Sequence, residues 1–482
     1  MSRKIMIQGA GSNVGKSVLV AGLCRAFWRR GLTVSPFKPQ NMSNNAAVAL
    51  DGGEIGRAQA MQALAARIES HSDLNPVLLK PQTEVGAAVI LQGKYLDSVK
   101  ARDFARFKPQ LMNAILDSFS RISAASDLVI IEGAGSPAEI NLRDGDIANM
   151  GFAEAVNAPV ILTGDIDRGG VIAQMIGTRE VLSKADRARI KGFVINKFRG
   201  DPTLFSKGLE EIVARTGWHA LGVMPWFADA SKLPAEDALD LPAHRGDGDF
   251  RIAVPRLSRI ANFDDLDPLA QEPDVSVEMI APGRPLPLDA DLIFIPGTKS
   301  TIADLAFFRA QGWDIDLAAH IRRGGHVLGI CGGYQMLGKK IIDADGVEGA
   351  PSSVAGLGHL DVVTHMHPEK HLANVRAEFL QNGLMLDGYE IHIGKTTGPD
   401  CRRGWLAVEG RAQGAQSASG RVQGSYLHGL FASNRFRKAY LQALGSDVSE
   451  FDYQRELDAT LDALADQIED NLDLDLILRL AE

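Results

Sequence analysis

Apolar residues in the first half of the chain occur in short continuous runs, most of which end at a polar or acidic residue. The clearest runs are Ile5–Ile7, Leu32–Phe37, Asp127–Gly133, Ala158–Asp165 and Ile190–Asn196. Continuous runs of this length are typical of strands that are buried on both faces, as in a parallel sheet. The pattern therefore predicts a series of buried parallel strands.

Between these runs the apolar positions follow helical spacing. Leu19, Leu23, Ala26 and Phe27 share one face of a helix that follows the first run, and residues 56–70 form a second helical pattern. Strands that alternate with helices predict an α/β domain with a doubly wound parallel sheet.

The pattern changes near residues 233–250, where the sequence is acidic and rich in turn-forming residues. We predict a linker at 236–249. A second α/β series follows, with strand candidates at 251–257, 291–296 and 326–330.

These changes of pattern predict the limits of the domains. The first domain is expected at 1–235 and the second at 250–440. Residues 441–482 are expected to form a C-terminal helical segment, because leucines at helical spacing stand there among many acidic residues. This pattern indicates a surface or packing helix without a catalytic role.

The composition is that of a globular protein with more than one domain: 482 residues, 45% hydrophobic and 23% charged. The net charge of −9 argues against broad binding of nucleic acid. Three cysteines are too few for a disulfide framework. No apolar run is long enough for a signal peptide or a membrane span. We therefore expect a cytoplasmic protein that binds neither nucleic acid nor membranes.

The segment Gln8–Ser17 is the strongest chemical signal in the first half. It lies between a predicted strand and a predicted helix, which is the context of a phosphate-binding loop. Its spacing departs from the usual Gly-x4-Gly-Lys-Ser, because position 10 is alanine and the first glycine lies one residue further from the lysine. Backbone amides and the lysine would bind phosphate oxygens, and the serine hydroxyl would bind Mg²⁺. We predict that a nucleoside triphosphate binds to Gly9, Gly11, Ser12, Asn13, Val14, Gly15, Lys16 and Ser17.

Further candidates stand near the ends of predicted strands. Glu132 ends an apolar run and is well placed to bind Mg²⁺, and Asp51 is a weaker candidate for the same metal. Asn196 opens a segment similar to the base-reading Asn-Lys-x-x-Asp pattern, with one residue inserted before the acid. Asp165 and Arg168 would contact phosphate or substrate, or else form only a tight turn.

Cys331 is the strongest signal in the second half. A predicted strand runs into Gly-Ile-Cys-Gly-Gly-Tyr-Gln, and a helical pattern follows. Small neighbours permit a sharp turn, and a helix N-terminus favours the thiolate, so we predict a nucleophile rather than a structural cysteine. His428 and His392 are candidate bases, and we prefer His428 because it ends a predicted strand. The amides of Gly332 and Gly297 would form the oxyanion hole.

Four further histidines raise the question of a metal site: His359, His365, His367 and His371. Their surroundings in the sequence lack other clustered ligands. We therefore predict no metal site there.

The cysteine segment resembles the nucleophile motif of the class I glutamine amidotransferases, which hydrolyse glutamine to release ammonia. In that superfamily a glutamate normally follows the histidine by two positions, whereas Leu430 stands here. This omission resembles the branch that comprises the cobyrinic acid a,c-diamide synthases and the cobyric acid synthases. In that branch the amidotransferase domain follows a dethiobiotin-synthetase-like ATPase domain. Segments 36–45, 54–59, 132–141 and 165–170 resemble the cobyric acid synthases in particular.

The resemblance covers nearly the whole chain. It implies a P-loop domain with a doubly wound parallel sheet, followed by a class I glutamine amidotransferase-like, flavodoxin-like α/β domain. It implies amidation of the b, d, e and g carboxylates of adenosylcobyrinic acid a,c-diamide, with one glutamine and one ATP used for each amide. Mg²⁺ is the implied cofactor, and Cys331 would form a glutamyl thioester while His428 moves protons. The corrinoid carboxylate would approach Lys38, Gln40, Asn41, Asn44, Asp165 and Arg168.

Other functions stay open at this point. A cobyrinic acid a,c-diamide synthase would apply the same chemistry to different carboxylates. A P-loop switch protein with a non-catalytic amidotransferase-like scaffold would give Cys331 no role and would need a basic or amphipathic tail, whereas this tail is acidic. The sequence is compatible with a homo-oligomer, and it leaves open which acids complete the Mg²⁺ shell and which residue replaces the missing glutamate.

Overall fold

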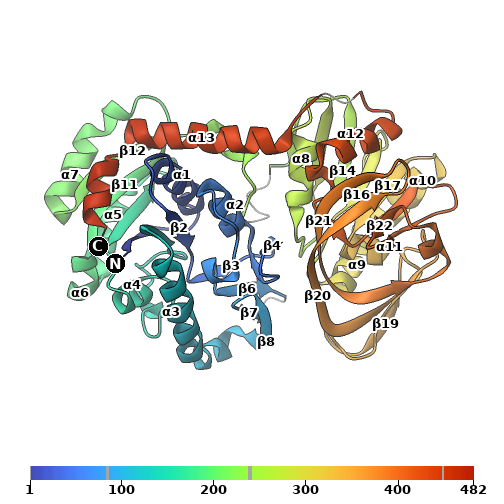
Figure 1. The fold of residues 1–482 in the computed structure, drawn as a ribbon, viewed down its shortest axis with the longest axis horizontal. Coiled ribbons are helices and arrows are strands. Elements are labelled where there is room, and N and C mark those ends of the chain that lie inside the picture. Colours follow the sequence, from blue (N-terminus) through green and yellow to red (C-terminus); the bar gives the residue numbers. More distant parts are fainter. Residues whose placement is uncertain (1, 83–85, 237–241, 448–449, 482) are drawn as a thin grey trace. The chain divides into compact units, whose positions relative to one another are not determined.

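A computed structural model gives the fold (Figure 1). The residues that it describes are 2–82, 86–236, 242–447 and 450–481. They form two compact units, and each consists of segments that are distant in the sequence. The first unit comprises Met1–Ser43, Ala49–Pro234 and Glu456–Glu482, and the second comprises Asn44–Val48 and Ala235–Arg455.

The first unit is built on a six-stranded sheet in the order β12-β11-β10-β1-β9-β2. All neighbouring strands in it are parallel, which confirms the doubly wound sheet expected from the buried apolar runs. The strands are β1 (Arg3–Gly9), β2 (Val34–Phe37), β9 (Leu128–Glu132), β10 (Val160–Asp165), β11 (Ile190–Phe198) and β12 (His219–Pro225).

Helices cover the faces of this sheet, and their aromatic and aliphatic side chains complete the core. Phe37, Phe119 and Phe152 form one aromatic cluster, with ring centroids 5.2–5.5 Å apart. Each such side chain contributes about 1.5–3 kcal/mol when it is fully buried. The helices are α1 (Lys16–Arg29), α2 (Arg57–Ala65), α3 (Lys108–Ala124), α4 (Met150–Ala155), α5 (Val171–Val181), α6 (Lys184–Arg189), α7 (Ser206–Thr216), α13 (Tyr453–Asn471) and α14 (Leu474–Leu480).

A second sheet of the first unit was not expected from the sequence. Its order is β3-β6-β7-β8, in which β3 and β6 are parallel and the other pairs antiparallel. Most side chains of β8 are exposed, so this strand lacks the apolar run that marks the central strands. The strands are β3 (Gln40–Met42), β6 (Val77–Pro81), β7 (Gly86–Leu91) and β8 (Lys94–Lys100).

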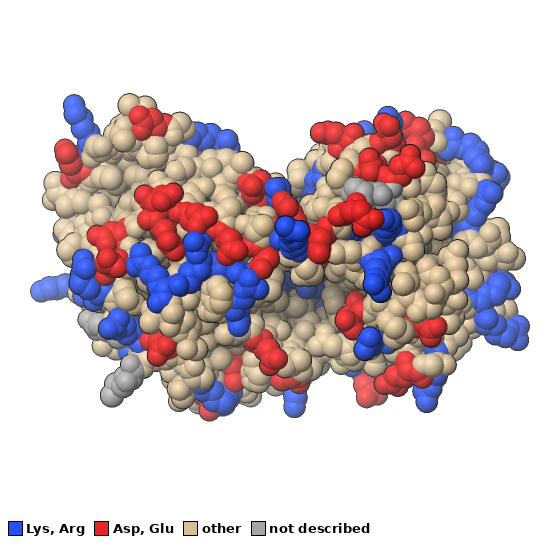
Figure 2. Space-filling model, turned by 45° about the horizontal axis from the view of Figure 1, so that its top comes forward, with Lys and Arg blue, Asp and Glu red and all other residues tan. Residues whose placement is uncertain are grey.

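The C-terminal helices return to the first unit, where Figure 1 shows them in red beside the blue and green elements. Leu464 and Ile468 of α13 pack so closely on Gly22 that a Cβ there would lie 2.4 Å from Ile468 Cδ1. The buried Arg25 guanidinium of α1 pairs with Asp458 at 2.7 Å and with Asp462 at 3.3 Å. Figure 2 shows acidic and basic side chains lying side by side on this unit. The tail is therefore a packing helix of the first unit.

The second unit contains a seven-stranded sheet in the order β13-β15-β14-β16-β17-β25-β24. Its middle strands are parallel, and both edge strands are antiparallel. The strands predicted near 251–257, 291–296 and 326–330 are β14, β16 and β17. The bounds are β13 (His244–Arg245), β14 (Phe250–Pro255), β15 (Val275–Ile280), β16 (Leu292–Ile295), β17 (His326–Ile330), β24 (Ala415–Gln416) and β25 (Val422–Ser425).

A second sheet and the helices α8 to α12 also belong to this unit. The sheet runs in the order β19-β18-β20-β21-β26, with β22 pairing to both β20 and β23. Its strands are β18 (Lys340–Asp343), β19 (Ser352–Ala355), β20 (Val363–Phe379), β21 (Leu384–Thr397), β22 (Leu406–Val408), β23 (Arg411–Gln413) and β26 (Leu427–His428). The helices are α8 (Asp267–Ala270), α9 (Thr301–Ala310), α10 (Trp313–Arg322), α11 (Gly332–Leu337) and α12 (Asn434–Ala443).

The predicted linker at 236–249 is only partly a linker. Residues 237–241 lie outside the described residues. Beyond them, His244–Arg245 form the edge strand β13, and Arg245 pairs with the buried Asp267 at 2.7 Å. This long-range ion pair fixes the segment on the second unit, although its local composition indicates only turns. Among the described residues, no helix combines the length and the apolar character that a bilayer span requires.

Candidate active sites

The predicted phosphate-binding loop joins β1 to the N-terminus of α1. Gly15 stands at that terminus with φ of 89°, and no side chain caps the first turn. The N–H groups at a helix N-terminus point toward a bound anion, so this turn suits a phosphate. A Cβ on Gly15 would lie 2.5 Å from Asn196 Nδ2, so both the backbone angle and the close neighbour require glycine.

Lys16, Ser17 and Glu132 meet at this loop. Ser17 Oγ donates to Glu132 Oε1 at 2.8 Å, and Lys16 Nζ donates to the Gly135 carbonyl at 3.3 Å. Lys38 Nζ also bonds to Glu132 Oε1 at 2.8 Å, and both side chains are buried. The amide of Gln62, which the sequence did not single out, donates to Glu132 Oε2 at 2.6 Å. A hydroxyl and a carboxylate side by side fit the hard-oxygen donor set of Mg²⁺.

Asn196, Asp165 and Arg168 lie at the β10–β11 side of the loop. Asn196 Nδ2 donates to the Val14 carbonyl at 2.8 Å. Lys197 Nζ bridges the Asn13 carbonyl at 2.5 Å and Asp165 Oδ2 at 3.0 Å. The largely exposed Arg168 guanidinium lies 3.7 Å from the same carboxylate. These contacts tie Asp165 to the loop backbone.

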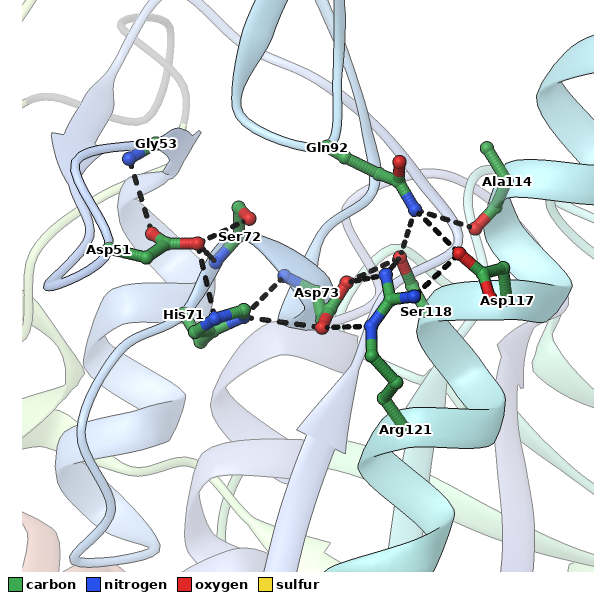
Figure 3. Close-up of polar contacts among 10 residues, drawn as sticks. All are labelled: Asp51, Gly53, His71, Ser72, Asp73, Gln92, Ala114, Asp117, Ser118 and Arg121. Atoms are coloured by element: carbon green, nitrogen blue, oxygen red, sulfur yellow. Dashed lines mark hydrogen bonds and ion pairs between the residues drawn. The ribbon is translucent and has the colours of Figure 1, made fainter.

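Asp51 belongs to a different cluster, shown in Figure 3. Its carboxylate accepts hydrogen bonds from the amides of Gly53 and Ser72 and from Ser72 Oγ, and it lies 3.2 Å from His71 Nε2. The contacts of Glu132 are with Ser17, Lys38 and Gln62 instead. The structure therefore does not bring Asp51 together with the predicted Mg²⁺ ligands, because turn contacts occupy its carboxylate.

The polar loop after β2 divides between several environments. Gln40 lines a cavity beside the phosphate-binding loop. Asn41 is buried and donates to Gln59 Oε1 at 2.8 Å, which is a packing contact. Asn44 belongs to the second unit. The predicted substrate residues therefore make different contacts and are divided between the two units.

Cys331 occupies a sharp turn between β17 and α11. Its φ and ψ are 52° and −109°, a conformation that non-glycine residues rarely adopt. Such strain persists where the surroundings enforce it, which is frequent at active sites. The thiol lies 3.6 Å from the Ile391 carbonyl, and Cys331 is at the N-terminal end of the helix. This geometry fits a nucleophile elbow.

Asp265, a residue that the sequence analysis did not identify, orients His428 so that it can act as a base. His428 Nδ1 bonds to Asp265 Oδ2 at 2.7 Å, and Asp265 Oδ1 accepts from the Gly429 amide at 2.7 Å. His428 Nε2 has no hydrogen-bond partner among the described residues. Burial disfavours the imidazolium, but Asp265 and then Cys331 outweigh it and raise the pKa of His428 to about 10.

An aromatic neighbour fixes the plane of the His428 ring. Tyr389 stacks on it with centroids 5.2 Å apart and planes 14° apart. Asn262 Nδ2 donates to the Tyr389 hydroxyl at 3.0 Å and to the Ala46 carbonyl at 2.8 Å. The His428 ring is therefore restrained both by stacking on its face and by the hydrogen bond at Nδ1.

His392, the other candidate base, stacks on Tyr426 at 3.8 Å and bonds through Nδ1 to the Gly394 carbonyl. Burial, with some contribution from His371, lowers the pKa of His392 to about 3, so it is a much weaker base than His428.

The two predicted oxyanion glycines lie close to the nucleophile and its surroundings. A Cβ on Gly297 would lie 3.2 Å from His428 Cε1 and 3.7 Å from Cys331 Cβ. A Cβ on Gly332 would lie 2.5 Å from the Thr298 side chain. Gly332 therefore needs to be glycine for the turn and the neighbouring loop to approach each other, and a Cβ on Gly297 would make tight contacts.

The second unit also gathers ligand-type side chains that the sequence left apart. His371 lies opposite His392 across β20 and β21, and Glu390 is two residues away on the same face. Their ligand atoms all lie within 4.8 Å of one another, and His371 pairs with Glu390 at 2.9 Å. The sequence analysis did not predict this group of three possible ligands.

Comparisons with known proteins cover both units. Residues 5–240 match the family model described as the CobQ/CobB/MinD/ParA nucleotide binding domain. Residues 251–436 match the model described as the CobB/CobQ-like glutamine amidotransferase domain. Cobyric acid synthase from Rhodobacter capsulatus is 62% identical, with 99% of each chain covered. The enzymes of that name from a Ruegeria species and from Bradyrhizobium diazoefficiens are 62% and 60% identical. They cover 99% and 100% of this chain, and 98% and 100% of their own.

Proposed function

The chain belongs to the cobyric acid synthase family, and from this premise we propose how its two sites perform the reaction. The family's function, cobyric acid synthesis in cobalamin biosynthesis, is the function of this chain. It is an amidating ligase with a nucleotide-binding domain and a glutamine amidotransferase domain.

We propose that the substrate is adenosylcobyrinic acid a,c-diamide and that the b, d, e and g carboxylates become amides. A carboxylate is a poor electrophile, so the first unit would transfer the terminal phosphoryl group of ATP to a carboxylate oxygen. This step forms an acyl phosphate and releases ADP. Ammonia then attacks the carbonyl carbon, the C–O bond to phosphate breaks, and inorganic phosphate leaves with the amide formed.

In the first unit Lys16 would neutralise the transferring phosphoryl group, and the backbone amides at the start of α1 would hold the other phosphates. Ser17 and Glu132 would hold Mg²⁺, which neutralises charge on the nucleotide when bound. Lys38, already paired with Glu132, adds a positive charge beside the same carboxylate. Asn196 would contact the base side of the nucleotide.

In the second unit the Cys331 thiolate would attack the amide carbon of glutamine. His428 would give a proton to the leaving nitrogen, and a glutamyl thioester and ammonia would form. Water, deprotonated by His428, would then release glutamate. Asp265 would hold the tautomer and the orientation of His428 in place of the glutamate that is replaced by Leu430. The amides at Gly297 and Gly332 would stabilise the oxyanion.

One observation carries this proposal. The chain holds a phosphate-binding loop with the Ser17–Glu132 pair in one unit and a strained cysteine near a buried, oriented histidine in the other. The reaction needs both, and it needs the cytoplasmic supply of ATP and glutamine, so we place it in the cytoplasm.

The test is to incubate the protein with ATP, Mg²⁺, glutamine and adenosylcobyrinic acid a,c-diamide and to follow the corrinoid by mass spectrometry. We expect stepwise conversion of the b, d, e and g carboxylates to amides. The same assay with cobyrinic acid, in which the a and c positions are free, serves as the control. Amidation only at a and c would identify a cobyrinic acid a,c-diamide synthase instead.

A further inference from the structure

A cavity of about 760 Å³ opens beside the phosphate-binding loop in the first unit. We call it the P-loop cavity. It begins at Ala10–Ser12 and extends between the second sheet and the loop 134–150 that follows β9. Its volume is in the range of sites that enclose organic ligands. Of the site residues described above, Gly11, Ser12, Gln40 and Gly135 line it.

The wall of the P-loop cavity is mainly apolar, and part of it is exposed. Leu79, Val89, Val99 and Phe104 contribute to the wall from β6, β7, β8 and the turn before α3. Two further lining residues, Met42 and Leu142, are 55% and 61% exposed. Large apolar side chains that are exposed inside a cavity indicate a surface that a ligand covers.

Polar and charged side chains also line the cavity, and they are Ser12, Gln40, Lys108, Ser136, Glu139, Arg143, Asp146 and Asn149. Of its two cationic side chains, Arg143 is held by Asp186 and Glu154. The Lys108 ammonium has no hydrogen-bond or ion-pair partner in the part of the chain that the structure describes. Asn149 is 9% exposed, and its Oδ1 likewise has no partner among the described residues. A buried acceptor without a partner is costly, so a donor from a ligand would stabilise it.

The cavity adjoins a different part of the phosphate-binding loop from the part that Asn196 and Lys197 contact. The contacts of Asn196 and Lys197 reach Val14 and Asn13 from β11. The cavity adjoins the residues before them, on the side of β9 and β2. Lys16 Nζ bonds to the carbonyl of Gly135, which lines the cavity. A carboxylate in the cavity would therefore lie near the lysine that receives the terminal phosphate.

We propose that the P-loop cavity binds the corrin ring on its apolar wall, with Lys108 pairing to a peripheral carboxylate and Asn149 accepting from an existing side-chain amide. This inference rests on the function proposed above and names the residues that recognise its substrate. The apolar wall fits a large apolar ring, and Lys108 and Asn149 fit the acidic and amide side chains at the edge of that ring. It assigns recognition to residues other than Asp165 and Arg168, which lie on the nucleotide side.

Binding to the full-length protein without ATP tests the inference, with two probes: adenosylcobyrinic acid a,c-diamide and a fully amidated corrinoid. Leu142→Gln should weaken both probes about five- to tenfold, because an apolar contact with the ring is lost. Lys108→Met should weaken only the acidic probe, by about fivefold, and should reduce the salt dependence of its binding. Isothermal titration calorimetry measures each affinity.

Matched controls exclude general damage to the unit. Leu204→Gln changes a leucine that is 80% exposed in the same unit and outside the cavity. Lys94→Met changes an exposed lysine on β8. Both controls should bind both probes like the wild type, and all four variants should keep the affinity for ATP.

Two failures are distinguishable. Unchanged affinities in Leu142→Gln and Lys108→Met, with an active wild type, would overturn the cavity assignment and leave the proposed function intact. Loss of ATP affinity in Leu142→Gln would also overturn it, because the cavity would then hold the nucleotide. A wild type that forms no amide from the a,c-diamide would instead overturn the proposed function.

Discussion

The phosphate-binding loop and the cysteine elbow are built alike, since each is a tight turn between a buried parallel strand and a helix. They differ at the residue that makes the turn. Gly15 has φ of 89° at the start of a 14-residue helix, and it offers only backbone. Cys331 has φ of 52° at the start of a six-residue helix, although it carries a side chain.

This difference follows from what each turn must present. An anion is bound by N–H groups, so the first turn gains from having no Cβ and from a long helix behind it. A nucleophile must project a side chain, so the second turn accepts a strained residue, at a cost of about 1–3 kcal/mol. The packing of Gly297, Gly332 and the surrounding strands holds that strain in place.

The largest expected effects distinguish the two turns by the nitrogen source, glutamine or ammonium, that each variant can still use for amidation. Cys331→Ser should lower glutamine-dependent amidation by a factor on the order of 10⁴ or more, because the nucleophile is lost. It should retain amidation driven by high ammonium. Lys16→Ala should lower amidation from both sources by on the order of 10³ while glutamine is still hydrolysed. Corrinoid mass and released glutamate are the two measurements, and equal losses with ammonium in both variants would contradict the division of labour.

Asp265→Asn should have the next largest effect, and only on the elbow. Without the carboxylate, His428 loses its orienting partner, and we expect kcat for glutamine hydrolysis to fall by on the order of 10²–10³ with little change in KM. The ammonium-dependent reaction should not change. Steady-state release of glutamate measures the effect, with Asp387→Asn, a change of an exposed acid in the same unit, as the control. A fall in the ammonium-dependent rate would show that Asp265 supports the fold instead.

The variant Gly15→Ala tests whether the phosphate-binding loop needs a residue without a Cβ at this position. We expect nucleotide affinity to fall by more than an order of magnitude, since the left-handed angle costs about 1–2 kcal/mol and the Cβ would meet Asn196. Gly31→Ala is the matched control, because its φ is 86° and no atom lies within 4 Å of a Cβ there. If both variants lost the same stability and bound ATP with the same affinity, the contact between the new Cβ and Asn196 would have no effect on nucleotide binding. Equilibrium binding of ATP and thermal unfolding provide the two readouts.

A smaller effect concerns pH and the stability of the elbow. Burial lowers the pKa of His428, but Asp265, followed by Cys331, outweighs it and raises this pKa from 6.5 to about 10, so the charged pair stabilises the fold fully below pH 6.5. This contribution is lost as pH rises toward 10. The stability advantage of the wild type over Asp265→Asn should therefore shrink across that window. Urea unfolding at several pH values measures it, and an advantage that grows with pH would contradict the charged pair.

Much of this fold is readable from the sequence, because it rests on local signals. Runs such as Ala158–Asp165 identify buried parallel strands, and the strand–turn–helix context identifies both turns. The second sheet of the first unit escapes this reasoning, because β8 has mostly exposed residues and owes its place to pairing with β7. Similarly, β13 is an edge strand that depends on a distant partner strand.

The candidate sites show the same division. Lys16, Ser17 and Glu132 meet as their positions at strand and helix ends suggest. Asp265 could not be found, because it stands 163 positions from His428 in a segment with several acids and no motif. Gln62 faces Glu132 from a helix whose face could not be assigned without the packing. Such long-range contacts carry no local pattern.

The central claim is that one unit activates a carboxylate and the other supplies the nitrogen. Glutamine labelled with nitrogen-15 in its amide, offered with ATP, the a,c-diamide and an excess of unlabelled ammonium at neutral pH, tests it most directly. The account predicts label in each new corrinoid amide with the wild type and only unlabelled amides with Cys331→Ser. Unlabelled amides with the wild type would contradict it, because the nitrogen would then not come from glutamine.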